Sequence, residues 1–128
     1  MAVMKRRALL LAGLVFPLPA LARGPVTVVN VSAWNCPYCV KWMNEQKPEW
    51  LRSPEYRRVR YVEIQSPTIK QAYKAEHWPA DLHGILDRLK TKNGTPRFLL
   101  VQKDEVVFNE FGLGGWPALR ARLAMLLG

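Results

Sequence analysis

Hydrophobic and polar residues along the chain form short blocks that predict four β-strands. The first block, Val-Thr-Val-Val-Asn-Val-Ser-Ala, is rich in β-branched and apolar residues, as in a buried strand. Three later blocks have a similar character, and the last two are separated by only a tight turn, which predicts a hairpin. The four predicted strands are 26–33, 58–64, 98–101 and 106–108.

A helix is predicted directly after the first strand, over 38–51. Its apolar positions are Val40, Trp42, Met43 and Leu51. Pro48 lies near the end of this segment, where its ring is expected to kink or stop the helix.

Two further helical regions are predicted, over 67–92 and from Pro117 to about Leu127. A proline in the first turn is typical of a helix start, and both regions begin with one. The longer region is interrupted at Trp78-Pro79, and Asn93-Gly94 ends it. Its second half carries apolar residues at helical spacing, namely Leu82, Ile85, Leu86 and Leu89.

The predicted order is β-α-β-α-β-β-α. Two strands joined through a helix favour a parallel pair with a right-handed crossover, whereas the closing hairpin must be antiparallel. The sequence therefore predicts an α/β domain over 23–128, with a central four-stranded mixed sheet flanked by helices. Neither an internal repeat nor a linker divides the domain.

Residues 1–22 have the pattern of a cleavable signal peptide. Lys5, Arg6 and Arg7 precede a short apolar run over 8–16, and Ala20-Leu21-Ala22 supplies small residues before the expected cleavage. The apolar run is short for a membrane span, although an uncleaved anchor is the alternative. Arg6-Arg7 also weakly resembles a twin-arginine signal, but general secretion is favoured. The expected location is periplasmic or otherwise exported.

The net charge of the chain is +9, from 19 basic and 10 acidic residues. Loss of 1–22 would remove three basic and no acidic residues and leave a net charge of +6. Acidic residues are interleaved with the basic ones, so we expect a solvated basic surface and no nucleic-acid partner. An acidic partner protein or a membrane surface is the alternative.

The chain has two cysteines, Cys36 and Cys39, separated by two residues. A disulfide across so short a loop constrains little of the unfolded chain, which argues for chemistry over stability. A static disulfide remains one alternative. Half of a zinc site is another, but it needs two more ligands, and His77 and His83 lack the spacing of a zinc module. We expect no metal and no cofactor.

Cys36-Pro37-Tyr38-Cys39 lies where the first strand meets the first helix. The free N–H groups and positive end of that helix favour the thiolate of Cys36, which makes it the expected nucleophile. Cys39 lies one turn later and is expected to resolve a mixed disulfide. This placement also predicts that the first sulfur is exposed and the second sheltered.

Gly94-Thr95-Pro96-Arg97-Phe98 precedes the third strand, and together with the cysteine motif it resembles the thioredoxin superfamily. The resemblance covers most of 26–127. It implies that Pro96 is a cis proline facing the cysteines, and that the backbone of Thr95 contacts an extended substrate peptide. Trp34, Tyr38 and Trp78 are candidates to line the groove, although ordinary packing is favoured for both tryptophans. Arg97 is expected either to meet a substrate carboxylate or to face solvent.

The motif details are similar to more than one branch of the superfamily. Cys-Pro-Tyr-Cys and the pair Gly114-Gly115 resemble glutaredoxins, but Trp116 follows where those proteins usually have an acidic residue. Thioredoxins keep a buried Asp where this chain has Asn30, and a Trp immediately before the first cysteine where it has Asn35. The thioredoxin-like component of bacterial sulfur-oxidation systems has a similar mixed character.

The expected activity is that of an exported thiol–disulfide oxidoreductase. Its expected partners are protein thiols and disulfides together with a redox partner protein, for which a membrane-bound protein is a candidate. Two alternatives remain: a glutathione-dependent reductase, with glutathione the less favoured donor, and a redox-inactive module that binds peptides. The sequence leaves the direction of exchange open, because this depends on the reduction potential.

Overall fold

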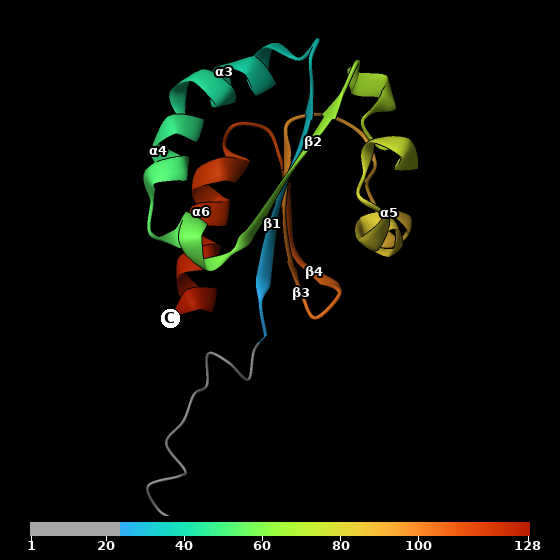
Figure 1. Ribbon diagram of the computed structural model, residues 1–128. Coiled ribbons are helices and arrows are strands. Elements are labelled where there is room, and N and C mark those ends of the chain that lie inside the picture. The colour runs from blue at the N-terminus through green and yellow to red at the C-terminus, as the bar shows by residue number, and fades with distance from the viewer. Residues whose placement is uncertain (1–23) are drawn as a thin grey trace, which may run out of the picture.

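The computed structural model describes residues 24–128, which form a four-stranded mixed sheet with helices on both faces (Figure 1). The strands are β1 (Val26–Ala33), β2 (Arg60–Ser66), β3 (Arg97–Gln102) and β4 (Glu105–Phe111). Their order in the sheet is β2-β1-β3-β4. β1 is parallel to β2 and antiparallel to β3, and β3 is antiparallel to β4. The predicted fold class and the parallel and antiparallel pairs are confirmed.

β1 is buried on both faces, which explains its continuous run of apolar residues. Val28 belongs to one core and Val29 to the other, because successive side chains of a strand point to opposite faces. The first core, here called the tryptophan core, contains Trp42, Trp50 and Trp116 beside Phe98. The second is covered by α5 (His83–Arg88) and the segment before it.

α3 (Pro37–Glu45), α4 (Lys47–Arg52) and α6 (Gly115–Leu127) cover the face of the tryptophan core (Figure 1). The prediction of one helix over 38–51 is wrong, because the helix breaks at Gln46. Pro48 has no N–H and its ring collides with the carbonyl four residues earlier, which accounts for a break there.

The inward face of this helical segment also differs from the prediction. Cys39 and Trp42 point inward at a spacing of three residues, whereas Val40 is 45% exposed. Trp50 follows Cys39 by eleven residues, or about three helical turns, so it lies on the same inward face and is fully buried, whereas Leu51 is 40% exposed. Met43 is half-buried, as a residue at the boundary of the buried stripe should be.

The opposite face is less helical than predicted. Instead of two helices over 67–92, the chain forms three single 3₁₀ turns, η2 (Ile69–Gln71), η3 (Ala75–His77) and η4 (Ala80–Leu82), before the short helix α5. Pro67 precedes these turns and Pro79 lies between η3 and η4, and a proline disfavours the helical conformation of the residue before it, which limits longer helices. The predicted apolar stripe is nevertheless buried in the second core, through Leu82, Ile85, Leu86 and Leu89.

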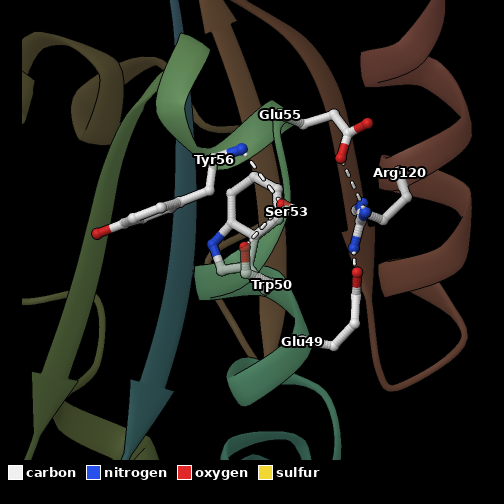
Figure 2. Close-up of polar contacts among 6 residues, drawn as sticks. All are labelled: Glu49, Trp50, Ser53, Glu55, Tyr56 and Arg120. Atoms are coloured by element: carbon white, nitrogen blue, oxygen red, sulfur yellow. Dashed lines mark hydrogen bonds and ion pairs between the residues drawn. The ribbon is translucent and has the colours of Figure 1, made fainter.

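Arg120 joins α6 to α4 and to the 3₁₀ turn η1 (Glu55–Arg58) at the edge of the tryptophan core. Figure 2 shows its guanidinium between Glu49, at 2.9 Å, and Glu55, at 3.1 Å. The same group lies 5.2 Å from the ring centre of Trp50. In the turn between α4 and η1, Ser53 donates a hydrogen bond from Oγ to the carbonyl of Trp50 at 2.7 Å.

Within residues 24–128, no helix is long and apolar enough to cross a membrane. The predicted signal peptide over 1–22 lies outside the described residues, so its structure is not tested. Of the predicted domain over 23–128, the structure describes residues 24–128.

Candidate active site

Cys36 and Cys39 form a disulfide at the N-terminus of α3. Cys36 is the residue that caps the helix, and its Sγ accepts a hydrogen bond from the backbone N–H of Cys39 at 3.1 Å. Pro37 occupies the first turn, where its missing N–H costs no helical hydrogen bond. The motif thus gives the first sulfur a direct contact with a free N–H of the helix terminus.

Both cysteines are buried in this disulfide form, since Cys36 is 1% and Cys39 is 2% exposed. In the oxidised protein the expectation that Cys36 is exposed is therefore wrong, whereas Cys39 is sheltered as expected. Ala33 forms a small apolar cluster with the pair, and Ile69 packs against this cluster. Any difference in reactivity between the two cysteines must come from their local hydrogen bonds and from reduction, because exposure in the oxidised state does not distinguish them.

The loop before β3 lies against the disulfide. The Thr95–Pro96 peptide bond is cis, and the Sγ of Cys36 lies 3.5 Å from the carbonyl oxygen of Thr95. Both Thr95 and Pro96 are buried. The fold therefore brings together two motifs that are 59 residues apart in sequence.

Exposed aromatic and apolar side chains surround the buried sulfurs. Trp34 is 69%, Tyr38 62% and Val40 45% exposed. Ordinary packing was favoured for Trp34, and that interpretation is wrong, whereas Trp78 is buried in the second core as expected. A small surface pocket beside Cys39 is lined by Ser32, Ala33, Trp34, Cys39, Val40, Met43, Asn44 and Gln65.

The segment between β1 and the cysteines is held at both ends. The N–H of Trp34 donates to the carbonyl of Ser66 at 2.9 Å, which continues the pairing with β2. The side-chain oxygen of Asn35 accepts from the N–H of Ile69 at 2.9 Å. Asn35, the residue before Cys36, is therefore connected to η2, whose Ile69 packs against the cysteine pair.

Asn30 is fully buried beneath the site and belongs to a polar group that extends to the protein surface. Its Nδ2 lies 3.5 Å from the hydroxyl of Tyr61, which donates to Glu63 at 2.8 Å. Lys47 pairs with Glu63 at 2.9 Å. Burial, followed by the charge of Glu63, raises the pKa of Tyr61 above its ordinary value. In this polar group the carboxylate belongs to Glu63 of β2, whereas position 30 of β1, where thioredoxins keep an Asp, holds a neutral Asn.

Arg97 follows Pro96 but is buried instead of facing solvent. It is 6% exposed, and its guanidinium donates to the carbonyl of Asn93 at 2.9 Å, to Asn109 at 2.8 Å and to the hydroxyl of Tyr73 at 3.1 Å. The expectation that Arg97 faces solvent is wrong, and its contact with a substrate carboxylate stays a prediction. Its burial depends on Tyr73 and Asn109, which are distant in sequence.

The other candidate residues take no part in the cysteine site. In the described range 24–128, no group of three or more His, Cys, Asp or Glu side chains is placed to hold a metal ion. His83 contacts the carbonyls of Ala75 and Trp78 at 3.0 Å each. Trp116 is buried in the tryptophan core, and Gly115 is the first residue of α6.

Comparison with solved structures identifies the fold. The periplasmic thioredoxin SoxS from Paracoccus pantotrophus, in its reduced form, matches 80% of this chain over 96% of its own, with 23% identity and a TM-score of 0.54. A thioredoxin from Fasciola hepatica matches 80% of this chain over 82% of its own, with 16% identity and a TM-score of 0.52. For thioredoxin f from spinach chloroplast, the shares are 89% and 87%, with 14% identity and a TM-score of 0.52.

No protein-family model matches the sequence, and no curated protein matches it significantly. The structural likeness is thus the comparison that bears on this chain, and at these identities it establishes the fold. The chain has the thioredoxin fold, with its Cys36–Cys39 disulfide at the start of α3 and beside the cis peptide of Pro96.

Proposed function

We propose that this protein is a thiol–disulfide oxidoreductase that acts on protein partners through Cys36 and Cys39. One observation carries the proposal: Cys36 caps α3, and its sulfur accepts the N–H of Cys39 at 3.1 Å. A hydrogen bond to sulfur from a free helix N–H stabilises the thiolate more than the thiol, and the thiolate is the reactive form.

In the reducing direction, the thiolate of Cys36 attacks one sulfur of a substrate disulfide. A bond forms between Cys36 and that sulfur, and the other substrate sulfur leaves as a thiolate. Deprotonated Cys39 then attacks the Cys36 sulfur, which restores the Cys36–Cys39 disulfide and releases the second substrate thiol. Two electrons pass from the protein to the substrate, and the reverse sequence oxidises a substrate dithiol. The Cys36–Cys39 disulfide fits this cycle, because the two sulfurs are bonded to each other across the first turn of α3.

Substrate contact is proposed for the residues around the sulfurs. Thr95 and Pro96 form one wall, where the Thr95 carbonyl lies 3.5 Å from Cys36 Sγ. Pro37 and Tyr38 form the exposed surface between the cysteines. An extended segment of a partner protein is the proposed ligand, because its backbone can lie along the 95–96 backbone while its disulfide meets Cys36.

An exported location is proposed as well. Residues 1–22 carry the charge and apolar pattern of a signal peptide, and one similar solved structure is a periplasmic thioredoxin. In such a compartment the protein needs a redox partner to renew its dithiol or its disulfide. Fusion of residues 1–22 to a reporter active only after export tests this part of the proposal: a silent reporter would contradict it.

The activity is tested by mixing the reduced protein with a peptide disulfide and measuring released thiol. We expect each protein molecule to reduce one disulfide, and Cys36→Ser to reduce none. A wild-type protein that leaves the disulfide intact would refute the proposal. The equilibrium reduction potential of the pair then decides the direction, since a strongly reducing value implies a reductase and a high value implies disulfide formation.

A further inference from the structure

Arg97 is a buried cation whose hydrogen bonds all go to neutral acceptors. None of the ion pairs within 24–128 includes Arg97. Its partners are two carbonyl or amide oxygens and one hydroxyl, and its guanidinium lies 5.6 Å from the ring centre of Phe111. Burial of a charge without a counter-ion is costly. A role in the arrangement of its neighbours would explain why an arginine occupies this place.

The hydrogen bonds of Arg97 and Tyr73 converge on the two residues before Thr95. The guanidinium donates twice to the carbonyl of Asn93, at 2.9 and 3.3 Å. Tyr73 donates from its hydroxyl to the carbonyl of Gly94 at 2.7 Å, and accepts from Arg97. Burial raises the pKa of Tyr73 to about 12, so the hydroxyl stays protonated and able to donate.

Gly94 is fitted closely into this arrangement. Its φ of +78° belongs to the left-handed region that favours glycine. A Cβ at this position would lie 2.6 Å from the ring of Phe111, so the backbone and the ring are in close contact. The chain at 93–94 is therefore held both by the two donors and by its contact with an aromatic ring.

We propose that Arg97 and Tyr73 are positioning residues that fix the backbone of Thr95 and Pro96 beside Cys36. This inference rests on the proposed function, because it concerns how a substrate peptide meets Cys36. The fork of Arg97 ties Asn93 to Asn109 of β4, and Tyr73 ties Gly94 to the loop after η2. The next residue along the chain is Thr95, whose carbonyl faces the sulfur.

Placement of this wall affects the reaction through alignment. Attack on a disulfide requires the incoming and leaving sulfurs to be aligned, and a displacement of about 1 Å can lower a rate about a hundredfold. A peptide disulfide must lie along the 95–96 backbone while its sulfur meets Cys36. A small aliphatic disulfide needs only the sulfur, so its reaction should not depend on the wall.

The test compares exchange rates of reduced wild-type protein and variants with a peptide disulfide and with hydroxyethyl disulfide. For Arg97→Gln, we expect the peptide rate to fall about tenfold or more and the small-disulfide rate to stay within about twofold. Tyr73→Phe should lower the peptide rate in the same selective way. Arg97→Lys keeps the charge but not the planar fork, so it should behave like Arg97→Gln.

Arg120→Gln is the matched control, because Arg120 also lies over aromatic rings but pairs with Glu49 and Glu55 (Figure 2) and with no residue of the 93–97 segment. It should leave the ratio of the two rates unchanged. The proposal is overturned if Arg97→Gln slows both disulfides equally or neither, if Arg97→Lys restores the wild-type ratio, or if Tyr73→Phe has the wild-type ratio.

A second measurement separates this inference from the proposed function. The N–H of Gly112 donates to the carbonyl of Pro96 at 2.8 Å, so its hydrogen exchange reports on the position of the 95–96 backbone. We expect faster exchange at Gly112 in Arg97→Gln and not in Arg120→Gln. Unchanged exchange in Arg97→Gln would overturn the positioning role even in a protein that exchanges disulfides. Failure of the wild type to react with either disulfide would refute the proposed function instead.

Discussion

Reduction of the disulfide should give two cysteines of unequal reactivity, with Cys36 the faster. Both are almost fully buried in the oxidised state, so their reactivities must differ for an electrostatic reason. The perturbation is a limiting amount of iodoacetamide, added to reduced protein at mildly acidic pH. The two thiols then compete within one molecule, and fragmentation of the labelled peptide assigns the modified cysteine.

The magnitude follows from the contacts of Cys36. Its sulfur accepts the Cys39 N–H at 3.1 Å, and a hydrogen bond to a charged group contributes about 1.5–3 kcal/mol. The helix terminus contributes about 0.3–1 kcal/mol more to an anion at this place. Together these favour the thiolate by about 2–4 kcal/mol, which is roughly a thirtyfold to thousandfold larger thiolate population.

The labelling rate rises by less than the thiolate population. A thiolate that is more stable is also a weaker nucleophile, and the loss is about half of the gain on a logarithmic scale. We therefore expect Cys36 to be labelled roughly fivefold to thirtyfold faster than Cys39. In concentrated urea, where α3 is lost, the two rates should become similar. Equal labelling in the folded protein, or faster labelling of Cys39, would refute the reasoning.

Three further predictions concern the donor, the core and alkaline pH. Glutathione should be a poor donor, because a missing acidic partner for its amino group costs about 1.5–3 kcal/mol and Trp116 is buried in the core. Saturable turnover with glutathione at low millimolar concentration would contradict this. Arg120→Gln should lower the free energy of unfolding by about 1–3 kcal/mol, through two partly exposed ion pairs and its contact with Trp50. Urea unfolding followed by tryptophan fluorescence measures this free energy. A change within experimental error would show that the contacts of Arg120 do not stabilise the fold. Tyr73 has its pKa raised from 10.0 to about 12 in the folded protein, mainly by burial, so its contribution to stability is complete below pH 10 and lost as the pH rises toward 12. Over that interval wild-type stability should fall by about 2–3 kcal/mol more than that of Tyr73→Phe, at 1.36 kcal/mol per unit. Parallel curves would show that folding does not raise the pKa of Tyr73.

The sheet was predictable because its strands carry strong local signals. β1 is a continuous run of β-branched and apolar residues, since both of its faces are covered, and its predicted bounds match the structure. β3 and β4 are joined at Lys103 and Asp104, both with positive φ, which suits the short hairpin that the sequence indicates. The position of the cysteine motif was predictable for the same reason, because the end of β1 and the start of α3 are adjacent in the chain.

The helical segments were harder to predict, because 3₁₀ turns and α-helices share similar spacing of apolar residues. Over 67–92 the apolar positions are buried as expected, but the backbone between them turns three times before α5 begins. The break at Gln46 was signalled by Pro48, but the inward face of the segment was not predicted. Cys39, Trp42 and Trp50 are buried, whereas Val40 and Leu51 are exposed.

The surroundings of the site depended on contacts between distant residues. An arginine after a proline gives no local sign of burial, and only the fold shows that Tyr73 and Asn109 supply its acceptors. Trp34 illustrates the opposite case, since a large aromatic residue would ordinarily be packed inside but is 69% exposed beside the disulfide. In both cases the sequence identified a residue near the site, and tertiary structure determined what it contacts.

The central claim is that Cys36 forms a covalent intermediate with its substrate and that Cys39 resolves it. Trapping in Cys39→Ser tests this most directly, because the variant keeps the attacking thiol and removes the resolving one. Reduced Cys39→Ser, mixed with a peptide disulfide, should accumulate a mixed disulfide that mass spectrometry assigns to Cys36, while Cys36→Ser accumulates little and the wild type releases the reduced peptide. Absence of a mixed disulfide in Cys39→Ser, with the peptide bound equally by the wild type and both variants, would contradict the account and favour a binding protein without redox activity.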